Sequence, residues 1–265
     1  MESQQHVVGI RVGPKDNGVL AGLNGRASLV SSAPAEQREG FPVDLASLLP
    51  GVGPEPVARL SRTARQRTLW AGIVVVSEEQ TDRAGVLIDG LLSTVVSLPD
   101  GRTAAVHYAK PIALFGLPTL FRPACISVRV IRTATVIELD AGEIRRCAHE
   151  YPDFGSFLYR QLAAEVCRLP LVVEEFGFMT VRQRVASHLI KLAESRGANT
   201  GVRTACVTQT ALAEYVGSAR EVVSRCLKEL GEAGIVARGH GSLQILNEAK
   251  LRRLANQRGG SSIGL

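Results

Sequence analysis

Hydrophobic and polar residues change their spacing several times along the chain. Between about residues 68 and 140 the apolar residues are mostly β-branched and fall in short runs, among them VLIDGLLSTVV and CISVRVIRTATVIELD. Turn signals at Ala71-Gly72, Asp89-Gly90 and Pro99-Asp100-Gly101 separate these runs. Short strands at this spacing predict an antiparallel sandwich or roll, with a hairpin turn at Pro99-Asp100-Gly101.

Helical spacing appears on both sides of the strands. Short helices are expected from Asp44 to Leu49 and from Glu55 to Ala64, and another begins at Ala141. A long helix is expected from about Asp153 to Phe176, in which Pro170 removes a backbone donor and should kink or divide the helix. Its apolar residues form one stripe, which either packs on its own domain or pairs with its twin in a homodimer: Phe154, Phe157, Leu158, Leu162, Val166, Leu169, Val173 and Phe176.

The C-terminal third carries a helix-turn-helix pattern. An amphipathic helix from Thr180 to about Ser195 precedes it. Thr208 is then placed to cap one helix, and Gly217 accepts the positive φ of a tight turn. The helix after that turn has a buried stripe of Val223, Leu227 and Leu230. Two helices joined in this way predict a helix-turn-helix.

The second helix of this pair carries candidate base-reading residues. Arginine can donate two hydrogen bonds to guanine, glutamate can accept one from cytosine, and the N-terminal end of such a helix enters the major groove. The four candidates share one face: Arg220, Glu221, Ser224 and Arg225. The alternative is a helical pair that packs only for stability and carries a Glu–Arg pair on its surface.

Two short apolar runs around Gly239-His240-Gly241 predict a β-hairpin, or wing, after the second helix. Polar side chains near the wing and the turn are candidates for contacts with the DNA backbone. These are Thr208, Gln209, Ser218, Arg238 and His240.

Composition and charge narrow the possible functions. The 265 residues suit two modest domains, with a net charge of +6. From Val181 onward there are 13 basic and 6 acidic residues, against 18 and 19 in the rest, so the excess positive charge lies in the last third. This distribution favours a polyanionic partner.

Several other classes of protein are disfavoured. No apolar run approaches the roughly 20 residues of a membrane helix, and the N-terminus has no secretory pattern, so we expect a cytoplasmic protein without membrane contact. Five scattered cysteines without C-x-x-C spacing argue against disulfides and a zinc site. The chain lacks G-x-S-x-G, H-E-x-x-H and phosphate-loop patterns, so we expect no enzyme, no catalytic residue and no metal site.

The stretch V-G-S-x-R-E-x-V-x-R, residues 216–225, resembles the recognition signature of the cyclic-AMP receptor protein and fumarate-nitrate regulator (Crp/Fnr) family. The resemblance extends from about Leu45 to Leu254. It implies an α+β chain with an N-terminal antiparallel β-roll, which is a jelly roll of the cyclic-nucleotide-binding type, then a long dimerisation helix and a C-terminal winged helix-turn-helix. It also implies that a homodimer reads a palindrome of G-T-G-A-like half-sites in double-stranded DNA, with RNA polymerase as a candidate partner.

The expected sensor pocket departs from the family pattern. Cyclic-nucleotide binders carry F-G-E, but this chain has Phe115-Gly116-Leu117, and Ala124 and Cys125 replace the family's arginine and serine. The usual Gly-Asp before this stretch appears as Ile112-Ala113. A buried phosphate without its cation is costly, so we expect no cyclic AMP and no cofactor. The expected pocket residues are Tyr108, Phe115, Gly116, Leu117, Ala124 and Cys125.

The departures from the family pattern leave other sensing modes open. An uncharged ligand or a filled core without ligand would both suit the apolar substitutions. An N-terminal iron–sulfur cluster is disfavoured, because no cysteine precedes Cys125. His107 offers an axial haem ligand, although a lone strand histidine is usually a core or surface residue. Redox sensing by Cys125 or Cys147 is the remaining alternative.

The sequence predicts the following division and function. We expect a flexible leader over 1–40, a β-roll over 41–150, a dimerisation helix and hinge over 151–178, a winged helix-turn-helix over 179–255 and a flexible tail over 256–265. The hinge at Phe178-Met179-Thr180 would set the distance between two recognition helices. The chain is thus expected to be a sequence-specific transcriptional regulator, and the alternative is a non-specific architectural DNA-binding protein.

Overall fold

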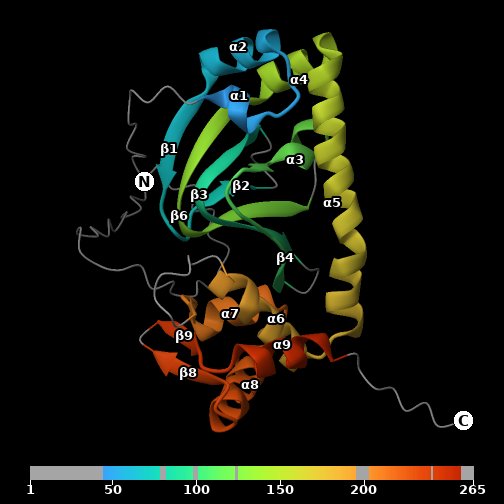
Figure 1. The fold of residues 1–265 in the computed structure, drawn as a ribbon. Coiled ribbons are helices and arrows are strands. Elements are labelled where there is room, and N and C mark those ends of the chain that lie inside the picture. The colour runs from blue at the N-terminus through green and yellow to red at the C-terminus, as the bar shows by residue number, and fades with distance from the viewer. Residues whose placement is uncertain are drawn as a thin grey trace, which may run out of the picture.

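The computed structural model of the protein describes residues 44–77, 82–97, 101–122, 125–194, 203–239 and 241–257. The leader expected over 1–40 and residues 258–265 of the expected tail lie outside this part of the chain. A β-sheet domain forms the upper part of the molecule, one long helix runs down its side, and a smaller domain of helices and a short sheet lies below (Figure 1).

The upper domain contains one sheet in which every pairing is antiparallel, as the β-branched runs predict. Its central path is β1-β6-β3-β4, with β2 also paired to β6 and β5 to β3. The strands are β1 (Arg65–Leu69), β2 (Val74–Val76), β3 (Arg83–Ser97), β4 (Thr103–Ala109), β5 (Ala113–Phe115) and β6 (Ile126–Asp140).

One of the expected turns is wrong. Asp89-Gly90 does not separate two strands but lies inside β3, where the register with β6 shifts. Gly90 has φ +102°, and a Cβ there would approach Ala134 Cα to 2.5 Å. Glycine therefore allows a bulge in one long, bent strand instead of a reversal of the chain.

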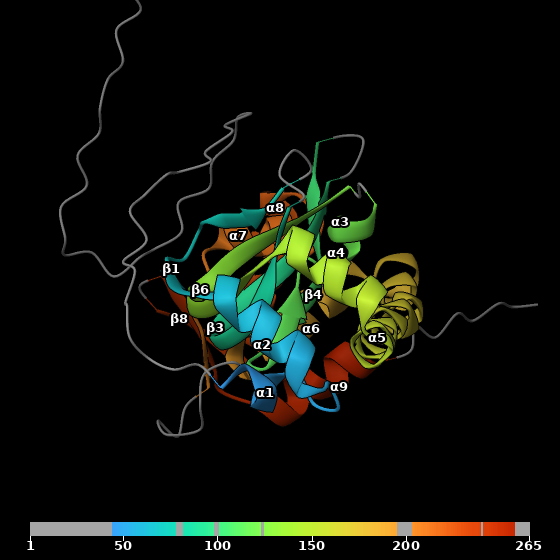
Figure 2. The ribbon, with the colours of Figure 1, turned by 90° about the horizontal axis from the view of Figure 1, so that it is seen from above.

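Helices cap the upper end of the sheet. The helices α1 (Leu45–Leu48), α2 (Pro54–Thr63) and α4 (Ala141–Glu150) lie there with the start of the long helix α5 (Pro152–Phe178), which is seen nearly end-on in Figure 2. Asp140 begins α4 by accepting a hydrogen bond from the Glu143 amide at 2.7 Å. Their apolar faces meet in one cluster, which includes Leu45, Leu60, Ile144, Phe154 and Phe157.

The long helix α5 continues through Pro170 without a break, so the prediction that this proline could divide the helix is wrong. A kink at Pro170 stays a prediction. Pro170 is exposed, and water can therefore reach the Val166 carbonyl that loses its partner. Only the first part of the apolar stripe is buried in this chain. Val166, Leu169 and Val173 are 62%, 56% and 61% exposed.

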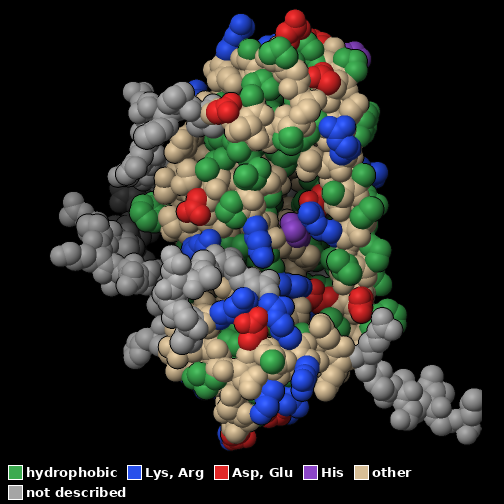
Figure 3. All heavy atoms as spheres, in the orientation of Figure 1, with side chains coloured by type: hydrophobic (Ala, Val, Ile, Leu, Met, Phe, Trp, Pro, Cys, Tyr) green, Lys and Arg blue, Asp and Glu red, His purple; other side chains and the backbone are tan. Residues whose placement is uncertain are grey.

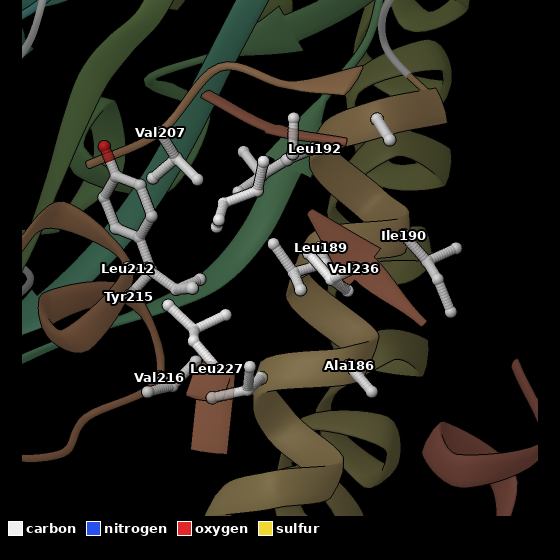
Figure 4. Close-up of a cluster of buried hydrophobic side chains, with 14 of the residues drawn as sticks. Ala186, Leu189, Ile190, Leu192, Val207, Leu212, Tyr215, Val216, Leu227 and Val236 are labelled. Atoms are coloured by element: carbon white, nitrogen blue, oxygen red, sulfur yellow. The ribbon is translucent and has the colours of Figure 1, made fainter. Parts of the chain in front are cut away.

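The lower domain has the expected winged helix-turn-helix order, with two elements that the pattern did not predict, β7 and α9. Its apolar side chains, such as Leu189, Leu212 and Leu227, lie around one interior (Figure 4). The same cluster includes Leu91 and Tyr108 from the large sheet. The elements are α6 (Val181–Glu194), β7 (Thr204–Ala205), α7 (Gln209–Tyr215), α8 (Arg220–Glu232), β8 (Val236–Gly239), β9 (Ser242–Ile245) and α9 (Glu248–Asn256).

The cluster around Phe154 predicts a large stability loss for Phe154→Ala. The side chain is 1% exposed and stacks on Phe157, with ring centroids 6.2 Å apart. Truncating a buried phenylalanine costs about 3 to 5 kcal/mol, because a cavity remains. Chemical denaturation should show this loss in the free energy of unfolding. The matched control Phe121→Ala, at a side chain 51% exposed, should lose far less, and equal losses would contradict this description of the core.

Candidate DNA-binding surface and sensor cavity

The turn between α7 and α8 is built as the sequence predicts. The Thr208 hydroxyl accepts a hydrogen bond from the Ala211 amide at 3.1 Å and so caps α7. Gly217 has φ +63°, a conformation that a side chain would strain. The next helix, α8, begins at Arg220. The cap therefore fixes the start of α7, and the glycine turn sets where α8 follows it.

The two faces of α8 have different roles. Val223, Leu227 and Leu230 are buried, as expected, and attach the helix to the domain. The structure places the four base-reading candidates on the other side of the first two turns, because Arg220 and Ser224, like Glu221 and Arg225, are four positions apart and share a helix face. Arg220, Glu221 and Arg225 are exposed, and Ser224 is half-buried.

A groove of about 740 Å³ separates α8 from the wing β8–β9. Arg225 and Lys228 line it from the helix, and Arg238 lines it from the wing. The Arg238 guanidinium donates a hydrogen bond to the Ser224 carbonyl at 3.4 Å and so connects the wing to the helix backbone. Figure 3 shows Lys and Arg side chains gathered over this lower part of the molecule.

The other backbone-contact candidates lie near the turn. Thr208 and Gln209 are half-buried at the N-terminal end of α7, and Ser218 is half-buried in the turn. His240 lies outside the described residues. The roles of these side chains toward DNA stay predictions.

A cavity of about 150 Å³ lies between the sheet and α5. Phe115, Gly116 and Leu117 line it, as the sequence predicts. Ile112 also lines it with φ +61°, a conformation that glycine adopts without strain and a β-branched residue rarely adopts. Ile112 thus has a backbone conformation that glycine would suit.

Two of the expected pocket residues are placed elsewhere. The prediction that Tyr108 lines the pocket is wrong, because its side chain points toward the lower domain and contacts His188. Cys125 is exposed and does not line the cavity, so its assignment is also wrong. The alternation of side chains along β4 explains the first error, since neighbouring residues of a strand face opposite sides. Ala124 lies outside the described residues.

One wall of the cavity is lined by polar side chains that the sequence analysis does not assign to the pocket. Gln161, Glu165 and Arg168 reach it from α5, and His107 reaches it from β4. Arg168 forms an ion pair with Glu165. Burial and the nearby Arg168 charge lower the pKa of His107. The spacing of residues 161, 165 and 168 by four and three was the available signal, because it marks a polar stripe on one helix face.

The structure also bears on the other sensing modes. Within the described residues, no group of three or more His, Cys, Asp or Glu side chains is arranged to hold a metal ion. Cys147 is buried, and burial raises the pKa of its thiol, which opposes formation of the reactive thiolate. Cys147 is therefore a poor redox sensor.

Comparison with known proteins agrees with this architecture. Residues 183–254 match the family model of the Crp-like helix-turn-helix domain. The chain is 27% identical over 216 residues to a CRP-like cAMP-activated global transcriptional regulator of Mycobacterium tuberculosis, covering 79% of this chain and 96% of that protein. It is also 27% identical over 180 residues to a transcriptional regulator of Thermus thermophilus, covering 67% and 86% of the two chains.

Solved structures show the same fold. A Crp/Fnr-family regulator of Eubacterium rectale superposes with a TM-score of 0.68 at 16% identity, covering 77% of this chain and 95% of that one. A Crp/Fnr-family regulator of Thermus thermophilus gives a TM-score of 0.61 at 23% identity, covering 73% and 100%. The fold and site define a protein with a β-roll and a winged helix-turn-helix DNA-binding domain. Residues 183–254 thus carry a Crp-like helix-turn-helix domain, and the chain is similar in sequence and fold to Crp/Fnr-type transcription regulators. In the part of the chain that the structure describes, no helix is both long and apolar enough to cross a membrane.

The capping hydrogen bond at the start of α7 predicts a moderate effect of Thr208→Ala. Loss of the cap should lower the free energy of unfolding of the C-terminal domain by about 1 kcal/mol. Thr208→Ser keeps a hydroxyl at the cap and should stay close to the wild type. Thermal and chemical unfolding of the full chain measure both variants, and a neutral Thr208→Ala would show that the cap does not stabilise α7.

Proposed function

We propose that this protein is a homodimeric, sequence-specific regulator that binds a palindromic operator and does not require cyclic AMP. The observation that carries the proposal is the placement of Arg220, Glu221 and Arg225 on the exposed face of α8. Two arginines and a glutamate can read guanine and cytosine edges in the major groove. Glutamate is repelled by phosphates, so its place between arginines favours base reading over plain charge attraction.

The exposed half of α5 supports a homodimer. Tyr159, Ala163, Val166, Pro170 and Val173 follow one another at spacings of three and four along one uncharged, exposed strip of the helix. An apolar strip of this length is costly to leave in water, and pairing with the same strip of a second copy would bury it. Two-fold pairing would also present two recognition helices to the two halves of a palindrome.

The cavity supports a sensor that does not bind cyclic AMP. Its volume of about 150 Å³ lies below the range of about 300 to 1,000 Å³ that is typical of small-molecule sites. Leu117 stands where the family has a glutamate, and the Arg168 charge is already paired with Glu165. The Mycobacterium tuberculosis relative is named as cAMP-activated, so this difference would separate two regulators of similar fold.

The remaining parts of the proposal follow from the resemblance. The relatives are transcription regulators, which supports a non-enzymatic role. The division at residues 150, 178 and 255, a cytoplasmic location and contact with RNA polymerase stay predictions.

The base-reading role predicts that Arg220→Ala and Arg225→Ala each lose specific DNA binding. Removing one bidentate guanine contact costs about 1 to 3 kcal/mol, or about 5-fold to 150-fold in Kd. Fluorescence anisotropy on a G-T-G-A palindrome, compared with scrambled duplex at one salt concentration, measures this ratio. Arg253→Ala, at an exposed site on α9, is the matched control and should keep it. Equal binding of palindrome and scrambled duplex by the wild type would instead favour a non-specific architectural protein.

The dimer predicts that a charge on the strip of α5 separates the subunits. Val166→Asp should shift sedimentation toward the monomer and weaken palindrome binding, because an unpaired carboxylate would be buried between helices. Trp70→Asp, at a side chain 55% exposed outside α5, should remain dimeric. A Val166→Asp protein that sediments as the wild type does would remove α5 from the interface.

A further inference from the structure

A chain of buried polar groups connects three elements where the sheet meets the lower domain. The Tyr108 hydroxyl on β4 lies 2.8 Å from Nδ1 of His188 on α6. His188 Nε2 lies 3.2 Å from Oε1 of Glu175, near the end of α5. The other oxygen of Glu175 accepts a hydrogen bond from Lys191 Nζ at 2.6 Å. His188 is fully buried, and the proposed DNA contacts do not use it.

The protons in this chain fit a neutral histidine. Burial raises the pKa of Tyr108 well above its usual value, so its hydroxyl keeps its proton and can donate to Nδ1. Burial also pushes the pKa of Glu175 upward, but His188 and Lys191 outweigh it and hold that pKa at about 2. Glu175 is therefore an anion, and the single proton of a neutral imidazole belongs on Nε2, which lies close to Glu175 Oε1 without forming a hydrogen bond to it in this structure.

The surroundings of His188 oppose a second proton. Burial lowers the pKa of His188 and outweighs Glu175 from α5, which favours the charged imidazole. Lys191 and Arg184 on α6 lower that pKa further. Tyr108 from β4 and Tyr215 from α7 complete the site, with their rings in edge contact at 6.2 Å. Any state in which His188 reaches water would restore its ordinary pKa of about 6.5.

The same site is the centre of the contact between the two domains. Ala104 of β4 forms a bridge with Val216 in the turn before α8. The Arg102 guanidinium donates to the Gly217 carbonyl at 3.2 Å, and Arg129 lies 3.5 Å from Glu214. Since α6 and α8 share one apolar core, the position of α6 against β4 also sets the direction of α8.

We propose that His188 is a positioning residue that holds the DNA-binding domain docked on β4 while it is neutral, and that its protonation releases that domain. The pH dependence of docking follows from the different protonation of His188 in the docked and released states. The docked state disfavours the protonated imidazole, so docking is most stable above pH 6.5 and weakens as the pH falls below it. This inference concerns docking alone and stands apart from the choice of DNA sequence.

Hydrogen exchange of the full-length protein, without DNA, tests the proposal. Peptides covering 102–109 and 212–218 report the docked surfaces, and each rate is divided by the rate of an unstructured chain at the same pH. Between pH 7.5 and 5.5 the wild type should lose about tenfold of this protection, because an exposed histidine with a pKa of about 6.5 takes up a proton over that range.

The variants separate His188 from other titrating groups. His188→Gln should lose the pH dependence, whereas His149→Gln, at an exposed histidine on α4, should keep it. If His188→Gln does not fold, Tyr108→Phe serves in its place, because it keeps the ring but lacks the donor to Nδ1. This variant should show lower protection than the wild type at pH 7.5 and should still lose protection as the pH falls. A flat profile in the wild type, or an unchanged step in His188→Gln, would overturn the proposal. Since no operator is present, this result is independent of whether the protein reads a palindrome.

Discussion

The apolar core that the large sheet shares with the winged helix fixes where the recognition helix lies. Leu91, Ala105 and Ile131 of the sheet are buried in the same cluster as Leu212 and the rest of the helix-turn-helix. Interiors pack at near-crystalline density, so two domains that share a core move as one body unless the whole contact opens. The exposed face of α8 is therefore presented by the complete molecule and not by a freely swinging domain.

The long helix α5 joins the same framework at both ends. Its first turns are buried against α1, α2 and α4 through Phe154 and Phe157, and its last turns deliver Glu175 to the domain contact. Between them, one face lines the cavity with Gln161, and the adjacent face leaves an uncharged strip exposed. One helix thus links the cavity, the proposed dimer contact and the DNA-binding domain, and a change at one site can reach the others through a single rigid element.

Local patterns predicted the elements that local physics controls. The period of three and four found α5 and α6, the cap and glycine found the turn at Thr208 and Gly217, and the β-branched runs found the sheet. Errors arose where tertiary contacts decide. Asp89-Gly90 has the composition of a turn, but pairing with β6 on both sides keeps β3 continuous. Tyr108 was placed in the pocket because the sequence does not show which face of β4 meets the second domain. The partners of His188 come from two other elements, β4 and α5, so no spacing could reveal them.

The most direct test of this account is fluorescence anisotropy of the purified, ligand-free protein on a labelled G-T-G-A palindrome. Scrambled duplex at the same salt concentration is the reference, and cyclic AMP is added afterwards. The account predicts preferential binding to the palindrome that cyclic AMP leaves unchanged. Binding that appears only after cyclic AMP is added would contradict the interpretation of the cavity. An absence of preference in both conditions would contradict the base-reading role of α8.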